Sequence, residues 1–216
     1  AGLGVVLVPT LVYGVNHHQI GDIIDYAIKH MPAVRGVHFQ PVSLFGRYPK
    51  NLTDRPLTLP FLMREIEKQT GGLIRQEYFA GGGAESAYCS LLASVVIMEN
   101  GTVVSAEKEK GNCCDATIEK SRKYVAKQWS ASEENQGKED DDSEAFASLD
   151  AFLKRSSTHK LMISAMFFQD VYSLDLNRLR QCKVGVASGE KIIPFCAYNL
   201  TALNGKALYR NSGAAK

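Results

Sequence analysis

The sequence lacks several features that mark large classes of protein. None of its apolar runs approaches the roughly 20 residues needed to cross a bilayer, and no charged and then apolar leader precedes a cleavage-like site. Lys and Arg are scattered rather than clustered, and the net charge is only +2. This pattern gives no sign of a nucleic-acid partner. We therefore expect a cytoplasmic protein without a transmembrane segment.

Common ligand and catalytic motifs are also missing. The triple glycine at 81–83 is followed by neither a Lys-Ser/Thr pair nor a spaced dinucleotide fingerprint, so it is not a phosphate cradle. No nucleophile elbow is present. Five cysteines are an odd number, which argues against a closed disulfide framework and leaves metal ligation, catalysis or burial as their roles. Because the chain opens on AGLG without Met and enters a strand pattern at once, we expect it to start within a domain.

What is present predicts a globular α/β protein. Of the 216 residues, 45% are hydrophobic, which is enough for a core. The apolar run 4–10 predicts a buried strand and the run 34–40 a second one. An apolar stripe over 20–28 predicts a helix between them, with Asn16 and Gln19 as its capping box. Two such strands should be parallel, with ligand-binding loops at their carboxyl ends, residues 10–15 and 41–48.

The remainder of the chain alternates helices and hairpins. Asn100-Gly101 favours a hairpin turn between strands 95–98 and 102–105, and the Ser/Glu/Asp-rich segment 130–144 is typical of a flexible linker. Further predicted elements are helices at 58–69, 117–128, 145–154 and 175–180, a strand at 161–168, and a last hairpin of strands 183–187 and 191–198.

The last hairpin brings two cysteines together. Cys182 and Cys196 are equally distant from the turn residue Gly189, so their side chains should lie in rough opposition. They are either two buried small hydrophobic groups or thiolate ligands of iron or zinc. Cys89, just after the glycine break, is a weaker candidate. The adjacent pair Cys113-Cys114 is poorly placed to bind one metal.

Several stretches are distinctive as sequence phrases. They are 5–12 (VVLVPTLV) with 14–16 (GVN), 36–42 (GVHFQPV) with 46–49 (GRYP), 164–170 (SAMFFQD), 175–179 (DLNRL) with Cys182, and 193–201 (IPFCAYNLT). Together they resemble radical-SAM iron–sulfur proteins, in particular the group of TrsS-like proteins and tetraether lipid synthases. The resemblance covers nearly the whole chain except the acidic segment.

The resemblance implies two cofactors. Cys89, Cys182 and Cys196 match positions that look like ligands of an auxiliary 4Fe-4S cluster. The family pattern has a further Cys where this sequence has Ala84 in AESAYC. By analogy Gln40 and Pro41, with Asn16 and Gln19, would line the S-adenosylmethionine pocket.

The Cys-x3-Cys-x2-Cys loop that holds the radical-generating cluster does not occur in these 216 residues. The resemblance therefore implies the C-terminal part of a radical-SAM oxidoreductase or alkylating enzyme. Such a part would be inactive alone and would need an N-terminal radical-SAM half or a reductant protein as partner. Alternatives are a non-catalytic iron–sulfur or zinc-binding module and an α/β protein that binds a small molecule.

The fold class expected is α/β: the last β-α-β portion of a partial (β/α) barrel, followed by an α+β C-terminal region with β-hairpins. The divisions expected are 1–70 for the barrel portion, 71–129 for an α+β region with a hairpin, 130–144 for the acidic linker, and 145–216 for the auxiliary-cluster region.

Overall fold

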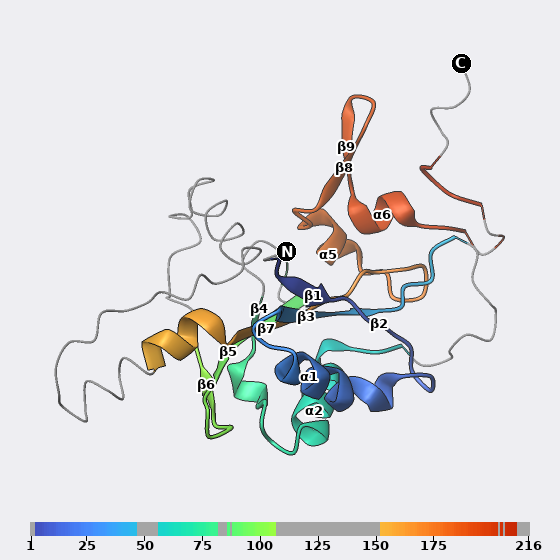
Figure 1. Ribbon diagram of the computed structural model, residues 1–216. Helices are drawn as coiled ribbons and strands as arrows, with labels where there is room; N and C mark the ends of the chain where they lie inside the picture. Colours follow the sequence, from blue (N-terminus) through green and yellow to red (C-terminus); the bar gives the residue numbers. More distant parts are fainter. Residues whose placement is uncertain are drawn as a thin grey trace.

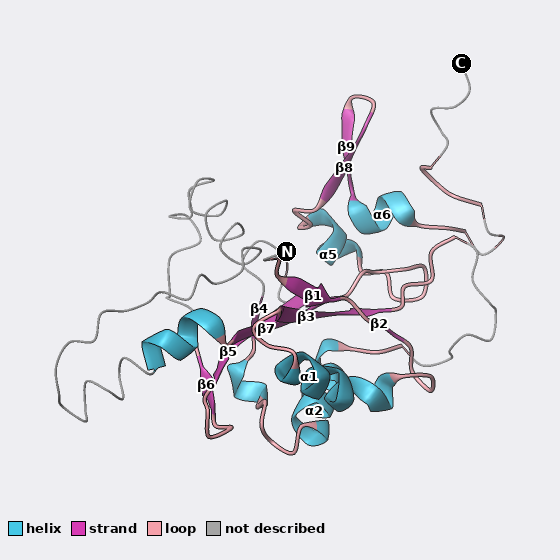
Figure 2. Ribbon diagram, in the orientation of Figure 1, coloured by secondary structure: helices cyan, strands magenta, loops and turns pink. Residues whose placement is uncertain are grey.

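The main feature of the protein, seen in a computed structural model, is one mixed sheet of seven strands (Figures 1 and 2). The structure describes residues 3–46, 56–81, 86, 88–106, 152–202, 204 and 206–210. The strand order is β1-β3-β7-β5-β4, with β2 beside β3 and β6 beside β5. The strands are β1 (Val5–Leu7), β2 (Thr10–Leu11), β3 (Val34–Pro41), β4 (Ala80–Gly81), β5 (Ser90–Ile97), β6 (Val103–Ser105) and β7 (Lys160–Met166).

The sheet is parallel on one side and antiparallel on the other. β1, β2 and β7 all run parallel to β3, whereas β5 pairs antiparallel with β7, β4 and β6. The predicted β-α-β unit is confirmed, because β1 and β3 are parallel neighbours joined through a helix. The α/β class is thus confirmed. Within the described residues the strands form an open sheet, and the assignment to a partial barrel stays a prediction.

Helices α1 (Ile20–Lys29) and α2 (Leu59–Gln69) lie together on one face of the sheet (Figure 1). The predicted stripe on α1 is buried there, and α2 begins at the expected cap, where the Thr58 hydroxyl accepts from the Phe61 N–H at 3.3 Å. Each fully buried aliphatic or Phe side chain contributes about 1.5–3 kcal/mol. Such side chains on the two helices and the sheet include Ile20, Ile24, Leu62, Ile66, Val37, Phe39, Leu161 and Ile163.

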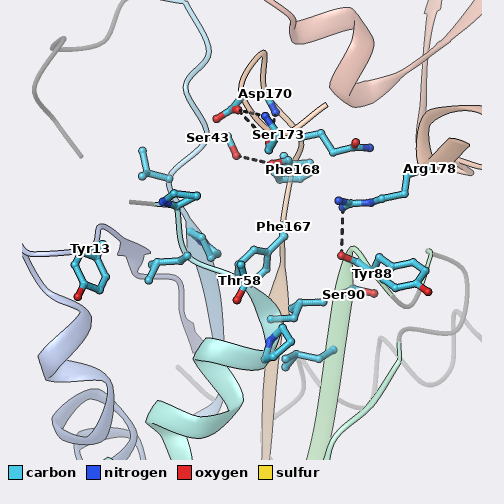
Figure 3. A pocket seen from close by; sticks show the side chains of 18 of the residues that line it. Tyr13, Ser43, Thr58, Tyr88, Ser90, Phe167, Phe168, Asp170, Ser173 and Arg178 are labelled. Carbon is cyan, nitrogen blue, oxygen red and sulfur yellow. Dashed lines mark hydrogen bonds between the residues drawn. The ribbon is translucent and has the colours of Figure 1, made fainter. Parts of the chain in front are cut away.

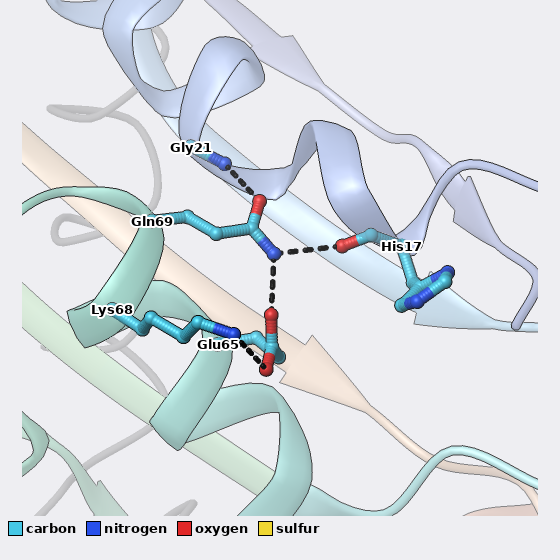
Figure 4. Close-up of polar contacts among 5 residues, drawn as sticks. All are labelled: His17, Gly21, Glu65, Lys68 and Gln69. Carbon is cyan, nitrogen blue, oxygen red and sulfur yellow. Dashed lines mark hydrogen bonds and ion pairs between the residues drawn. The ribbon is translucent and has the colours of Figure 1, made fainter.

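The two helices approach closely at Gly21 (Figure 4). The Gln69 side chain on α2 accepts from the Gly21 N–H at 3.0 Å and donates to the His17 carbonyl at 2.9 Å and to Glu65 at 2.7 Å. A Cβ at residue 21 would stand 2.6 Å from the Gln69 carbonyl oxygen. Only glycine therefore allows this crossing.

The Asn16 and Gln19 capping box is wrong, because neither side chain caps the short helix η1 (His17–Gln19) or α1.

The predicted hairpin around Asn100-Gly101 is confirmed by the pairing of β5 with β6, and Gly101 has the positive φ of 79° that such a turn requires. Residues 152–158 are helical, so the helix predicted at 145–154 ends later than expected. Three predicted segments lie outside the described residues: the first part of this helix, the helix at 117–128 and the flexible segment 130–144. In the described part of the chain, no helix is long and apolar enough to cross a membrane.

The C-terminal elements lie on the opposite side of the sheet from α1 and α2 (Figure 1). The predicted helix at 175–180 is confirmed, with the Asp175 carboxylate capping it. The strands of the last hairpin are shorter than predicted. These elements are α5 (Leu176–Arg180), β8 (Gly185–Ser188), β9 (Lys191–Pro194) and α6 (Phe195–Asn199), and the remaining short helix, η2 (Gln76–Tyr78), precedes β4.

Candidate functional site

A pocket of about 1490 Å³ opens where the parallel strands end (Figure 3). It is lined by residues 13–15 after β2, by 41–44 at the end of β3 and by 167–170 after β7, together with the first turn of α2 and the start of β5. Both loops that the sequence predicted as ligand-binding therefore contribute. The pocket is larger than the roughly 300–1,000 Å³ of ordinary ligand sites. Its walls are largely apolar, with hydroxyl groups from Tyr13, Ser43, Thr58, Tyr88, Ser90, Tyr172 and Ser173.

Asp170 holds the wall of this pocket together. One carboxylate oxygen accepts from the Leu44 N–H at 2.9 Å, and the other accepts from the N–H groups of Tyr172 and Ser173 and from the Ser173 hydroxyl. The loop after β3 is thereby fixed to the loop after β7. The side chain is 8% exposed, and its acceptors are already in use. Asp170 thus has a structural role in the wall of this pocket.

A second, much smaller cavity of about 30 Å³ adjoins the first. The two share Phe167, Phe168, Gln169 and Arg178 as lining residues. All three predicted ligand cysteines line this small cavity, although they come from different parts of the chain. Cys89 precedes β5, Cys182 follows α5, and Cys196 lies in α6.

Each of the three sulfurs makes one polar contact. Arg178 Nη2 donates to Cys89 Sγ at 3.1 Å, the Gln169 backbone N–H donates to Cys196 Sγ at 3.3 Å, and Cys182 Sγ donates to the Val184 carbonyl at 3.3 Å. Burial raises the pKa of the Cys196 thiol, and the Gln169 N–H offsets part of this rise. Cys196 therefore stays a neutral thiol at pH 7 when no metal is bound.

The hairpin argument for the two C-terminal cysteines is wrong in detail. The β8–β9 ladder runs from Ser188↔Lys191 to Gly185↔Pro194 and ends before either cysteine. Pro194 has no N–H with which to continue a ladder, and the chain turns into α6 at the next residue, so that Cys196 is helical. The two thiols meet at one cavity because α5 and α6 stand at the open end of the hairpin.

The donor chemistry of this cavity suits an iron–sulfur cluster, which proteins hold through thiolates. Within the described residues, no three His, Cys, Asp or Glu side chains are placed to hold a metal ion. A cluster several atoms wide holds its thiolates farther apart than a single ion does, so the cavity of about 30 Å³ would have to widen to admit one. Ala84 lies outside the described residues, whereas Ser86 and Lys183 line the cavity.

Of the four residues predicted to line an S-adenosylmethionine pocket, Pro41 lines the large pocket. The Asn16 amide instead spans its own loop, accepting from the Val12 N–H at 2.8 Å and donating to the Thr10 carbonyl at 2.9 Å. Gln19 is exposed, and Gln40 is half-buried in β3, where its backbone N–H donates to the Pro9 carbonyl. Their role in cofactor binding stays a prediction.

Comparison with known proteins gives one informative similarity. No family model matches the chain. It is 29% identical over 241 aligned positions to the 7,8-dihydro-6-hydroxymethylpterin dimethyltransferase of Methanocaldococcus jannaschii. The match covers 90% of this chain but 48% of the relative, so the chain spans about half the length of that protein. The similarity is to a methyltransferase. It does not bear on the predicted resemblance to TrsS-like proteins in particular.

Proposed function

We propose that the chain is the C-terminal part of a radical-SAM enzyme that transfers a methyl or other alkyl group, and that Cys89, Cys182 and Cys196 hold an auxiliary 4Fe-4S cluster. The observation that carries the proposal is the meeting of three cysteines, distant in sequence, at one cavity beside a large pocket. The similarity to a dimethyltransferase over 90% of the chain supports the reaction class.

The residues of this chain have positioning roles in such an enzyme. The apolar walls, including Phe167 and Phe168, would exclude water from a bound ligand. Asp170 would keep the two strand-end loops in register. S-adenosylmethionine bound in the complete enzyme would supply a 5'-deoxyadenosyl radical for hydrogen abstraction. The radical-generating cluster would come from outside these 216 residues, since they contain no Cys-x3-Cys-x2-Cys loop. A separate reductant protein would supply the electron.

Anaerobic reconstitution of the chain with iron and sulfide tests the cluster. Broad visible absorption and stoichiometric iron are expected in the wild type, and both should fall strongly in Cys182→Ala and Cys196→Ala. Cys113→Ala is the matched control, because Cys113 belongs to no proposed site. Iron binding that is equal in all four proteins would contradict the ligand assignment.

A second candidate function is the binding of a small molecule by an α/β protein without metal. The size of the pocket and the burial of Cys196 favour it, since free cysteines are often simple core residues. The same experiment separates the two functions. A wild-type chain that binds neither iron nor zinc supports this second function, and zinc without iron supports a zinc-binding module.

A further inference from the structure

We propose that Arg178 is a positioning residue that sets the charge at the cysteine site and thereby raises the reduction potential of the cluster held there. This inference rests on the proposed function. Arg178 lines both the cysteine cavity and the large pocket. Its Nη2 donates to Cys89 Sγ at 3.1 Å. The same nitrogen donates to the Tyr88 carbonyl at 3.2 Å, as Figure 3 shows.

The helix that carries Arg178 is capped at its first turn. The Asp175 carboxylate accepts from the Arg178 backbone N–H at 3.2 Å and from that of Asn177 at 2.8 Å, which caps α5. The Asp175 N–H in turn donates to the Gln169 side chain at 2.6 Å, while the Gln169 backbone N–H donates to Cys196 Sγ. One short network therefore links the helix that carries Arg178 to the buried thiol.

Arg178 also has an unpaired hydrogen-bond donor among the described residues. Its Nε is buried and has no hydrogen-bond partner among the described residues. A buried N–H without an acceptor is unfavourable. A negatively charged group bound in the cavity would give it one, because a guanidinium can donate several hydrogen bonds in one plane. The site is thus suited to an anionic occupant.

The consequence for a cluster follows from its charge. One-electron reduction adds a negative charge to the cluster and its thiolates. A nearby cation and N–H donors to sulfur stabilise this reduced state, and both raise the reduction potential. In the described part of the chain the other basic residue lining the cavity is Lys183. Arg178 is the one with a hydrogen bond to a ligand sulfur.

Redox titration of the reconstituted full chain tests this inference. Arg178→Gln removes the charge at similar length and should lower the midpoint potential, with about a tenfold change in the oxidised-to-reduced ratio, or roughly 59 mV for one electron. Arg178→Lys keeps the charge without the planar fork and should lie between the two. Arg180→Gln, an exposed arginine on the same helix, is the matched control and should titrate like the wild type.

The outcomes distinguish failure of the proposed function from failure of the role proposed for Arg178. A wild type without iron overturns the proposed function and this inference with it. A cluster with the same potential in Arg178→Gln as in the wild type overturns this inference alone. Iron lost from Arg178→Gln, with an unchanged potential in the fraction that remains and in Arg178→Lys, would make the arginine a purely structural residue and would also overturn it.

Discussion

Gly21→Ala should destabilise the protein, although alanine is normally the better helix residue. The new Cβ would stand 2.6 Å from the carbonyl oxygen of Gln69 and 2.9 Å from its carbonyl carbon and Cβ. These are largely backbone atoms, so no rotamer change can relieve the contact. Helices α1 and α2 must move apart, which weakens the hydrogen bond from the Gly21 N–H to the Gln69 side chain.

The expected change is the difference of three effects. Overpacking of a core contact costs about 1–3 kcal/mol, and the weakened hydrogen bond adds about 1 kcal/mol. The higher helix propensity of alanine offsets about 1 kcal/mol. The free energy of unfolding should therefore fall by about 1–3 kcal/mol, measured by urea denaturation of wild type and Gly21→Ala.

A Gln69→Ala protein shows whether the steric contact or the lost hydrogen bond causes the destabilisation. Gln69→Ala removes the side-chain hydrogen bonds but leaves the backbone and Cβ of residue 69 in place. Gly21→Ala should therefore remain destabilising in a Gln69→Ala protein. A Gly21→Ala variant as stable as the wild type, or more stable, would refute the claim that this crossing needs glycine.

Three further predictions concern the site and the sheet. Asp175→Ala removes the cap of α5 and should lower the free energy of unfolding by about 1 kcal/mol in urea denaturation; an unchanged value would show that the cap is not used. Cys196 should be alkylated by iodoacetamide more slowly than Cys89, because it is 6% exposed and burial raises its pKa; mass spectrometry would show the opposite order if this is wrong. Burial lowers the pKa of His38 and of His159 below 6.5, so the unfolded chain binds more protons, and stability should be full above pH 6.5 and fall as the pH drops through the folded values. Urea titrations from pH 8 to 5 test this, and His38→Asn should flatten the dependence.

Local features of the sequence predicted most of the regular elements. The apolar stripe of α1 and the Asn100-Gly101 turn act between neighbours in the chain, and both are confirmed. Asn16 shows the limit of such reasoning. Its side chain could cap a helix or span the preceding turn, and the sequence cannot rank two local hydrogen-bond sets of similar free energy.

Local sequence patterns could not predict the order of the strands in the sheet or the full composition of the site. Nothing near 160–166 indicates that this strand lies between β3 and β5. No local pattern singles out Arg178, because its importance depends on the tertiary contact that brings its guanidinium to Cys89, 89 residues away in sequence. The convergence of the cysteines was expected, but from a strand that ends at Pro194 rather than from the helix that follows.

The central place of β7 has a consequence for how the chain folds. His38 on β3 contacts Ser164 on β7 across 126 residues of sequence, and β5 completes its pairing through the same late strand. Until residues 160–166 are made, β3 and β5 each present an unpaired edge that can join another chain. Closing so long a loop slows folding. A ribosome-bound chain that stops before β7 should therefore depend on chaperones, and its aggregation should cease once this strand emerges.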